Sequence, residues 1–349
     1  MCDTISESSR IDCVVSMIGV VAIGRNEGGR LIRCLQSALR DTVRIVYVDS
    51  NSTDNSVVDA TALGVEVVRL DPTQPFSAAR GRNAGFERLV ALFPHIEFVQ
   101  FVDGDCEIAD GWIKLAVESI RRNESIAVVC GRRKEREPTR NAYHQLIDLE
   151  WDTPCGEVAA CGGDALIRRV AFEKVGGLDP TIIAGEEPEF CARLRQAGYT
   201  ICRIDHDMTI HDINMNRFRQ WWRRSLRSGF GAADVAHRLR DVGDVYFAHQ
   251  LRSAWLWGGV FPLASVVMAA ALIPLGMSWA LMPLAGCLLL YFVQLLRIAR
   301  GLSARGVVFP NNLSGAWLLL ASKPAQVIGQ LQFIFSSRHR ANRSAIEYK

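Results

Sequence analysis

Two aspartates separated by one glycine, Asp103 and Asp105, could bind a metal ion. They follow the apolar run 97–102, and Gly104 lets the chain turn sharply so that both carboxylates approach one centre. Magnesium and manganese prefer hard oxygen ligands, usually one or two carboxylates with phosphate oxygens. The alternative is an ordinary Asp-Gly turn. Because open α/β sheets bind ligands at their strand ends, we predict a cation held here against a diphosphate.

Other acidic residues stand at comparable positions. Asp49 ends the run 44–48 and precedes a polar stretch in which helix capping, the alternative role, suits residues 52–54 better than Asp49. Further along, Glu187 directly precedes Pro188, which favours the first position of a helix. Glu187 is therefore expected at the N-cap, where the helix dipole lowers the pKa of a carboxyl and weakens it as a base.

The elements that must position these residues alternate between short β-branched runs and amphipathic helices. This alternation predicts a parallel α/β sheet over residues 14–103. The expected strands are 18–23, 44–48, 65–70 and 97–102, with helical faces over 31–39 and 77–93. The second half is less regular: a strand over 126–130, an arginine-rich loop, helices near 165–175 and 188–197, and a strand over 200–205 with a short loop after it.

Composition excludes several classes of protein. The 349 residues carry a net charge of +3, too balanced for a general nucleic-acid binder, so no nucleic-acid partner is expected. The 10 cysteines include no Cys-x-x-Cys pair, which argues against a zinc ribbon or a disulfide framework and favours a reducing compartment. Residues 1–10 do not have the order of a signal peptide.

Residues 253–296 contain no charged side chain. Because a bilayer core takes about 20 residues per helix, this run predicts two spans, 254–273 and 279–296, joined by the helix breakers at 274–278. Arginines flank both ends, so both flanks are expected in the cytoplasm and the turn outside. The alternative is a buried helical pair in a soluble protein.

The segment 315–335 is interrupted by Lys323 and Pro324, so an in-plane helix is predicted there instead of a third span. The tail that follows carries four basic residues against Glu347, and it is expected to adhere to anionic lipid. The basic residues are Arg338, Arg340, Arg343 and Lys349.

Taken together, the motifs resemble those of the family 2 glycosyltransferases with the GT-A fold, over residues 14–231. They are Gly24 to Glu27, Asp49 to Asp54, Arg80 to Gly85, and Asp103-Gly104-Asp105, which looks like the Asp-x-Asp motif. The resemblance implies that Glu27 and Asp49 contact the nucleoside, that Asp103 contacts the ribose or the metal, and that Asp105 binds the metal. Arg82 is similar in position to an arginine near the nucleotide; the alternative is a solvated helix arginine.

Later motifs extend the resemblance. Gly162 and Gly163 look like the glycine pair beneath the donor sugar, and Asp164 could then bind a sugar hydroxyl or, alternatively, cap a following helix. Glu187, with Glu186 as the alternative, occupies the place of the acid that deprotonates the acceptor hydroxyl. His211 is similar in place to a histidine that completes the cation site in some GT-A enzymes.

A basic and aromatic stretch follows, with Trp221, Trp222, Arg223 and Arg224 at its centre. It looks partly like the Gln-x-x-Arg-Trp element of processive synthases, but the tryptophans precede the arginines, so processive synthesis is not inferred. The tryptophans could offer a flat surface to a sugar or lipid and the arginines could meet phosphate. The alternative is an interfacial helix anchored by these residues.

The expected fold is α/β, a GT-A mixed sheet with helices on both faces, plus a C-terminal transmembrane helical hairpin. The segments are a polar N-terminus (1–13), the GT-A catalytic domain (14–215), a basic, aromatic, membrane-proximal helical segment (216–252), two transmembrane helices (253–297), and an interfacial helix with a basic tail (298–349).

The expected function is metal-dependent, inverting transfer of a sugar from a nucleotide-diphosphate sugar to a lipid-linked saccharide acceptor in cell-surface or extracellular polysaccharide synthesis. The cofactor would be Mg or Mn. The expected location is the inner membrane, with the catalytic domain facing the cytoplasm. A nucleotidyltransferase should carry a glycine-rich basic loop, which residues 24–30 match poorly. A non-enzymatic membrane scaffold should have lost the metal pair or the base, and both are present.

Overall fold

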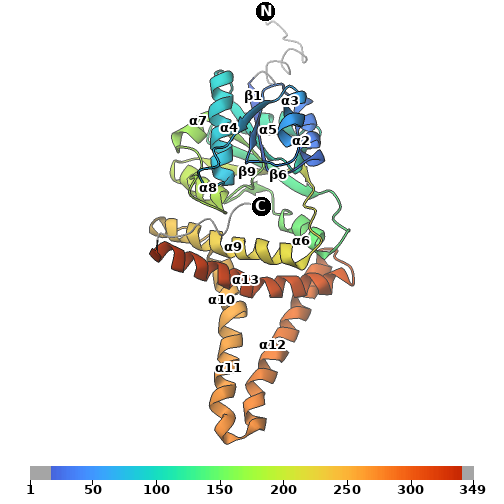
Figure 1. Ribbon diagram of the computed structural model, residues 1–349, viewed down its shortest axis with the longest axis vertical. Coiled ribbons are helices and arrows are strands. Elements are labelled where there is room, and N and C mark those ends of the chain that lie inside the picture. The colour runs from blue at the N-terminus through green and yellow to red at the C-terminus, as the bar shows by residue number, and fades with distance from the viewer. Residues whose placement is uncertain (1–16, 340–349) are drawn as a thin grey trace, which may run out of the picture. The chain divides into compact units, whose positions relative to one another are not determined.

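The computed structural model describes residues 17–339, which divide into two compact units (Figure 1). The sheet unit holds residues 17–136 and 148–213, and the helical unit holds residues 137–147 and 214–339. The predictions for the segment 1–13 and for Arg340, Arg343 and Lys349 lie outside the described residues.

Four parallel strands form the first half of the sheet, in the order β3-β2-β1-β4. Every residue of β1 and β2 is buried, which requires cover on both faces of the sheet, so the strands read as continuous apolar runs. The predicted parallel sheet is confirmed, with strand ends shifted by one residue. The strands are β1 (Ile18–Gly24), β2 (Ile45–Asp49), β3 (Glu66–Arg69) and β4 (Phe98–Asp103).

The sheet continues from β4 as β8-β6-β9-β5, with β7 paired to β9. Strand β8 is antiparallel to both β4 and β6, so the whole sheet is mixed, as expected for the GT-A fold. These strands are β5 (Cys106–Ile108), β6 (Ile126–Glu135), β7 (Gly156–Glu157), β8 (Ala165–Arg168) and β9 (Thr200–His211).

Helices of the sheet unit pack on these strands through apolar faces. In α2, Leu31, Cys34, Leu35 and Ala38 form the buried face, as predicted. Helix α4 lies so close to the sheet that a Cβ on Gly85 would be 2.3 Å from Cγ1 of Val21, so only glycine fits there. The helices are α2 (Gly29–Leu39), α3 (Ser56–Ala62), α4 (Ala78–Leu92), α5 (Trp112–Arg121), α7 (Arg169–Lys174) and α8 (Glu186–Gln196), and α6 (Ala142–Glu150) lies at the boundary with the helical unit.

Three predictions in the second half are wrong. The arginine-rich loop after Cys130 is the second half of β6, which continues after register shifts near Gly131. The expected helix 165–175 begins as strand β8, because this segment pairs with β4 and β6. The loop expected before His211 is strand, since β9 runs to His211 itself.

In the helical unit, α9 (Phe218–Arg238) packs along α13 (Asn311–His339) at backbone distance. A Cβ on Gly229 would lie 2.2 Å from the Gln326 carbonyl oxygen, and one on Gly329 would lie 2.1 Å from that of Leu226. The indole nitrogen of Trp221 donates to the Leu318 carbonyl at 3.0 Å. Glycines on both helices therefore create the close contact.

A helical hairpin extends from this pair of helices (Figure 1). Its first arm comprises α10 (Ala248–Trp255), a π-helical turn η2 (Leu256–Val260) and α11 (Phe261–Leu272), and its second arm is α12 (Met277–Ala304). Short 3-10 turns lie at η1 (Arg240–Val242) and η3 (Ile273–Leu275).

Both arms, Ala248–Leu275 and Met277–Ala304, are long and apolar enough to cross a membrane. Only 11% and 6% of their most apolar windows are buried in the described chain, with Leu263 66% and Leu288 72% exposed. A buried helical pair, the alternative raised by the sequence, would hide these side chains.

Candidate active site

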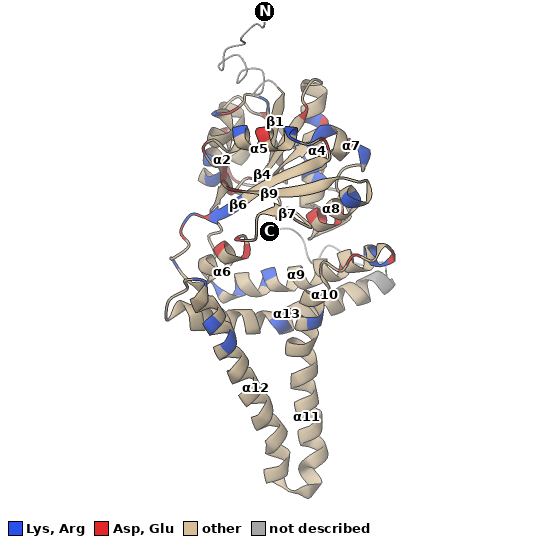
Figure 2. Cartoon of the chain, turned by 180° about the vertical axis from the view of Figure 1, so that it is seen from behind, with Lys and Arg blue, Asp and Glu red and all other residues tan. Residues whose placement is uncertain are grey.

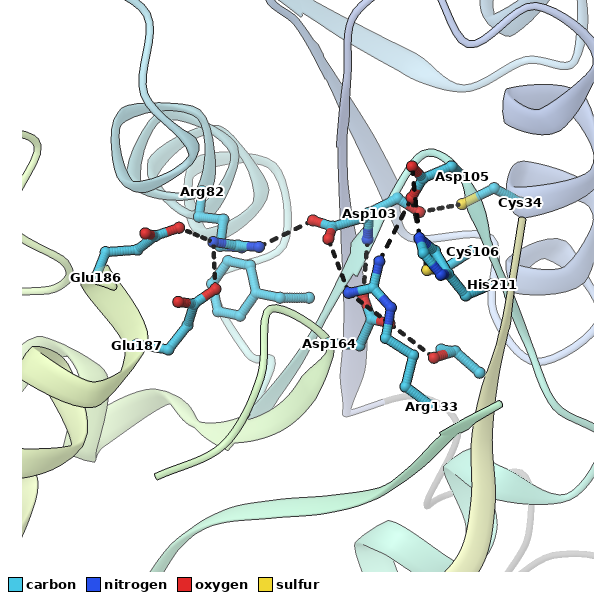
Figure 3. A network of polar contacts seen from close by, with 12 residues as sticks. Cys34, Arg82, Asp103, Asp105, Cys106, Arg133, Asp164, Glu186, Glu187 and His211 are labelled. Atoms are coloured by element: carbon cyan, nitrogen blue, oxygen red, sulfur yellow. Dashed lines mark hydrogen bonds and ion pairs between the residues drawn. The ribbon is translucent and has the colours of Figure 1, made fainter. Parts of the chain in front are cut away.

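The turn between β4 and β5 carries the two aspartates (Figure 3). Its amide at Gly104 donates to the Ile23 carbonyl at 2.7 Å, which fixes the turn against the end of β1. A Cβ on Gly104 would lie 3.1 Å from that carbonyl oxygen and 3.2 Å from Cγ of Glu27. Glycine therefore brings the end of β1, with Glu27, beside Asp103 and Asp105.

Arg82 of α4 connects the aspartates to the acid pair of α8. Its side chain is 4% exposed, and its Nη2 lies 2.9 Å from Oδ1 of Asp103. Its Nη1 lies 2.8 Å from Oε1 of Glu186 and 3.2 Å from Oε1 of Glu187. The alternative of a solvated helix arginine is wrong, because a buried guanidinium requires such partners.

Arg133 of β6 is a second buried cation, and the sequence analysis missed it. Its Nη1 lies 3.1 Å from Oδ2 of Asp103, and its Nη2 lies 3.6 Å from Oδ1 of Asp105. Although burial alone would raise the pKa of Asp103, the charges of Arg82 and Arg133 lower it below its usual range. Asp103 is therefore held as a carboxylate between two arginines.

His211, at the end of β9, faces Asp105. Its Nδ1 lies 2.8 Å from Oε2 of Glu135, a buried carboxylate that accepts the Nδ1 proton in the neutral ring, which leaves the lone pair of Nε2 to bind a cation. Nε2 lies 3.8 Å from Oδ2 of Asp105. Two ligand atoms about 2.1 Å from one ion are at most about 4.2 Å apart, so Asp105 and His211 fit a divalent cation.

Cys106 completes the geometric cluster of Asp105, Cys106 and His211, whose ligand atoms all lie within 4.8 Å of one another. Burial raises the pKa of its thiol well above the usual value, so it stays protonated. Hard cations also prefer oxygen and nitrogen to sulfur. Within this cluster, Asp105 and His211 are therefore better suited than Cys106 to hold a hard cation.

Glu187 lies on the opposite side of Arg82 from the aspartates (Figure 3). The predicted N-cap position is wrong: Gly185 is the N-cap, with φ of 87°, and Glu187 is the second residue of α8. Burial, followed by the charge of Glu186, raises the pKa of Glu187 to about 8, although Arg82 opposes the shift. Burial and the charge of Glu186 therefore outweigh the charge of Arg82, and the carboxyl can exchange a proton close to neutral pH.

The two glycines before β8 leave space that side chains from other parts of the protein occupy. A Cβ on Gly162 would lie 2.6 Å from Cζ3 of Trp151, and one on Gly163 would lie 2.3 Å from Nη2 of Arg82. The guanidinium of Arg133 also lies over the ring of Trp151, with Cζ of Arg133 5.4 Å from the ring centroid. Gly163 thus gives Arg82 room to reach the acids, and Trp151 is a second site residue that the sequence analysis missed.

Asp164 is fully buried and connects three strands. Its Oδ1 accepts from the Asp103 amide at 2.9 Å, and its Oδ2 accepts from the Thr209 hydroxyl at 2.7 Å. The segment after it is β8, so the alternative role as a helix cap is wrong. The contacts of Asp164 hold Asp103 at the end of β4.

The two acids expected near a nucleoside lie at the ends of β1 and β2. Asp49 is buried and accepts from the Tyr47 hydroxyl and the Ser52 amide, each at 3.0 Å. Glu27 is buried beside Gly104 and pairs with Arg30 at 2.5 Å. The sheet unit therefore brings together every predicted site residue from Glu27 to His211.

The remaining predicted residues belong to α9 of the helical unit. Trp221 is 4% exposed and packs against Tyr143, with ring centroids 6.1 Å apart. Trp222 is half-buried beside Phe218, whereas Arg223 is exposed and Arg224 half-buried. An acceptor-side role stays a prediction for Trp222, Arg223 and Arg224, while Trp221 serves the packing of α9.

Comparisons with known proteins show which family and fold this chain resembles. The profile of glycosyl transferase family 2 matches residues 20–176, and that of glycosyl transferase family group 2 matches residues 150–296. The pre-mycofactocin glycosyltransferase of Mycobacterium tuberculosis is 25% identical over 266 residues, which are 72% of this chain and 55% of the relative. The chain thus spans about half the length of that relative.

A second relative, the O-antigen chain rhamnosyltransferase WbaN of Salmonella anatum, is 23% identical over 271 residues, 70% of this chain and 82% of the relative. Among solved structures, the mannosyltransferase PcManGT from Pyrobaculum calidifontis, in complex with GDP-Man and Mn2+, superposes with a TM-score of 0.56 at 16% identity. The match covers 90% of this chain and 87% of that one, and it shows a shared GT-A fold. Together the two family models match residues 20–296, which supports the membership of this chain in the family 2 glycosyltransferases.

Proposed function

We propose that this protein transfers a sugar from a nucleotide-diphosphate sugar to a hydroxyl of a lipid-linked saccharide, with inversion at the anomeric carbon. The observation that carries this proposal is the bridge made by Arg82, which contacts Asp103 on one side and Glu186 and Glu187 on the other. The carboxylate proposed to contact the ribose or the metal and the acid proposed as the base thus lie on either side of one guanidinium.

The donor end is proposed to use Asp105 and Nε2 of His211 as ligands for Mg or Mn, with Glu27 and Asp49 toward the nucleoside. The bound cation would neutralise the negative charge that develops on the departing diphosphate. PcManGT, the structural neighbour, holds GDP-Man and Mn2+. Asp103 remains ionised between Arg82 and Arg133 and is proposed to contact the ribose or the metal.

The acceptor end is proposed to use Glu187 as the base. Its carboxylate takes the proton of the acceptor hydroxyl while that oxygen forms a bond to the anomeric carbon, on the face opposite the breaking bond to the diphosphate. Gly162, Gly163 and Asp164 are proposed to lie beneath the donor sugar.

A lipid-linked acceptor in cell-surface polysaccharide synthesis is supported by two observations. The hairpin arms are long and apolar enough to span a bilayer, which would keep the enzyme beside a membrane-borne acceptor. WbaN, which is similar over most of its length, is an O-antigen chain rhamnosyltransferase. We propose the inner membrane as the location, with the sheet unit in the cytoplasm.

The alternative of a nucleotidyltransferase is disfavoured by the loop after β1. The Gly28 amide, which a phosphate cradle would present to the ligand, donates to Oδ2 of Asp54 at 3.1 Å. The alternative of a scaffold is disfavoured because the metal pair and the base share one network.

The test is a donor screen on the whole protein in detergent, which measures nucleotide-diphosphate release with and without lipid-linked acceptors. We expect one donor to give acceptor-dependent release that chelator abolishes and Mn or Mg restores. Full release in chelator would refute metal dependence, and release that Glu187→Gln leaves unchanged would refute the assignment of the base.

A further inference from the structure

The helical unit contains a cavity of about 550 Å³ where α13 passes the two arms of the hairpin. This volume lies within the roughly 300–1,000 Å³ of ligand sites in proteins. The walls are apolar and aromatic side chains from η2, α11, α12 and α13, among them Trp257, Tyr291, Leu295, Trp317 and Pro324. We call this cavity the hairpin groove.

The walls of the hairpin groove are held by backbone contacts. A Cβ on Gly258, in the π-helical turn, would lie 2.4 Å from the carbonyl of Lys323, so η2 and α13 touch with no side chain between them. The Tyr291 hydroxyl donates to the Trp257 carbonyl, and their rings meet edge-on with centroids 5.5 Å apart. π-Helical turns are frequent at functional sites. The groove is therefore a preformed cavity.

The charges around the hairpin groove have one sign. Residues 248–339, which supply all its walls, contain six Lys and Arg residues and no Asp or Glu. Figure 2 colours the basic residues blue, and they lie on α13 and near the end of α12, away from the uncharged remainder of the hairpin. This pattern fits a ligand with a hydrocarbon part and an anionic head.

Lys323, next to the wall residue Pro324, supports an anionic head. Its Nζ lies 3.4 Å from Oε1 of Gln326, and among the described residues it has no carboxylate partner. Burial disfavours the charged form of Lys323 and so lowers the pKa of its ammonium. A phosphate nearby would stabilise the charged form.

We propose that the hairpin groove binds the hydrocarbon chain of a phosphate-bearing lipid, the carrier of the acceptor saccharide. The identity of that lipid rests on the proposed function. The site of the lipid is then the hairpin groove and not the ring of Trp221, which the sequence had suggested. Recognition is by apolar and aromatic contact along the chain and by basic residues at the phosphate.

The experiment uses the whole protein in phosphatidylcholine nanodiscs, labelled with a diazirine-bearing polyprenyl phosphate and mapped by mass spectrometry. The variant Ala321→Trp fills the hairpin groove from α13, and Leu295→Trp fills it from α12, so the test does not depend on one variant folding. The matched control is Val267→Trp on α11, which is 58% exposed and outside the groove.

In the wild type we expect the label on peptides of η2, α12 and α13. Either groove variant should weaken labelling about tenfold, equivalent to about 1.4 kcal/mol, while Val267→Trp labels like the wild type. Equal labelling of all variants, label spread evenly along both arms, or full competition by phosphatidylglycerol would overturn the proposal.

Catalytic assays on the same variants separate this proposal from the proposed function. Filling the hairpin groove should raise KM for the lipid-linked acceptor and leave nucleotide-sugar binding unchanged. If the wild type transfers no sugar to any acceptor, the proposed function fails, whereas photolabelling still decides whether the groove binds the lipid.

Discussion

Two buried arginines set the charge of the candidate active site. Arg82 and Arg133 meet five carboxyl groups, those of Asp103, Asp105, Asp164, Glu186 and Glu187. The acids outnumber the arginines, so the site attracts a further cation and resists full ionisation of its acids. Asp103 and Glu187 therefore shift in opposite directions, the first because both arginines contact it and the second because burial dominates.

For Glu187 this predicts a pH dependence. A base must be ionised, and with a pKa of about 8 Glu187 is mostly protonated at pH 6, so the wild-type turnover should rise about tenfold per pH unit up to about pH 8 and then level off. Glu187→Gln should lower turnover about 100-fold or more and remove this dependence, with nucleotide-sugar binding kept. Initial rates between pH 5.5 and 9.5 measure both.

The control is Glu186→Gln, which changes the neighbouring acid on the same arginine. Because the charge of Glu186 raises the pKa of Glu187, this variant should keep the rise but move its midpoint to lower pH. If Glu186→Gln is inactive and Glu187→Gln active, Glu186 is the base.

The cation site gives a second prediction. Asp105→Ala should abolish Mn2+ binding and transfer, because its carboxylate is a proposed ligand of the cation. Glu135→Gln should weaken Mn2+ binding about 10- to 100-fold, because it removes the carboxylate that orients His211. Mn2+ titration followed by electron paramagnetic resonance reads the affinity directly, without activity.

Glu137→Gln serves as the control for Glu135, since Glu137 is exposed two residues further on and pairs with Arg140 at 2.9 Å. Its Mn2+ affinity should equal that of the wild type. Equal affinity in Glu135→Gln as well would mean that Glu135 has no part in cation binding.

At the scale of elements, helix α4 carries Arg82 and is positioned by glycines. A Cβ at Gly85 would lie 2.3 Å from Cγ1 of Val21 and 2.9 Å from Cγ2 of Val48, within the fully packed sheet. Gly85→Ala should therefore destabilise the protein by about 1–3 kcal/mol. A lower melting temperature of the whole protein in detergent would show this.

Gly81 provides the comparison within α4. A Cβ there would lie 3.4 Å from Cγ2 of Ile23, an ordinary contact, and alanine favours helix over glycine by about 1 kcal/mol. Gly81→Ala should leave the melting temperature unchanged or raise it. Equal loss in both variants would mean that helix packing at Gly85 is not the cause.

The sequence predicted best where one force acts alone. The strands β1 and β2 are fully buried, and residues 253–296 of the hairpin carry no charge, so hydrophobicity alone predicts these elements. The sequence did not predict the second half of β6, in which Arg133 and Glu135 continue the strand although the segment has the composition of a polar loop. Their partners Asp103 and His211 lie far along the chain, and no local pattern contains that pairing.

The same limit explains the site residues. Asp105 and Glu187 were predicted because they stand in short motifs, whereas Glu135 and Trp151 act through neighbours that only the folded sheet brings near. Trp221 shows the converse: a tryptophan next to arginines predicts an open aromatic surface, but α13 covers its ring.

At the scale of the whole molecule, the hairpin predicts a topology. Arginines flank both ends of the uncharged run 253–296, so the turn at Gly276 should lie outside and both termini inside. On a background without cysteines, a cysteine near Gly276 should react with an impermeant reagent in intact cells. Cysteines at Ser8 and Ser344, which lie outside the described residues, should react only after permeabilisation.

External labelling at Ser344 would contradict this topology. It would require an odd number of crossings and would make α13 a third span instead of an interfacial helix. The lysine at 323 and the proline at 324, within α13, argue against a span.

The close contact of α9 with α13 has a consequence for biosynthesis. The 72 residues between Arg238 and Asn311 leave the ribosome before α13 begins, and at about 5–20 residues per second they take roughly 4 to 14 s. Throughout that interval the face of α9 around Trp221 and Gly229 has no α13 to cover it, although the sheet unit is complete. A nascent chain therefore passes through a stage in which an apolar helix face is uncovered, and chains that terminate before Asn311 stay there as substrates for chaperones and proteases.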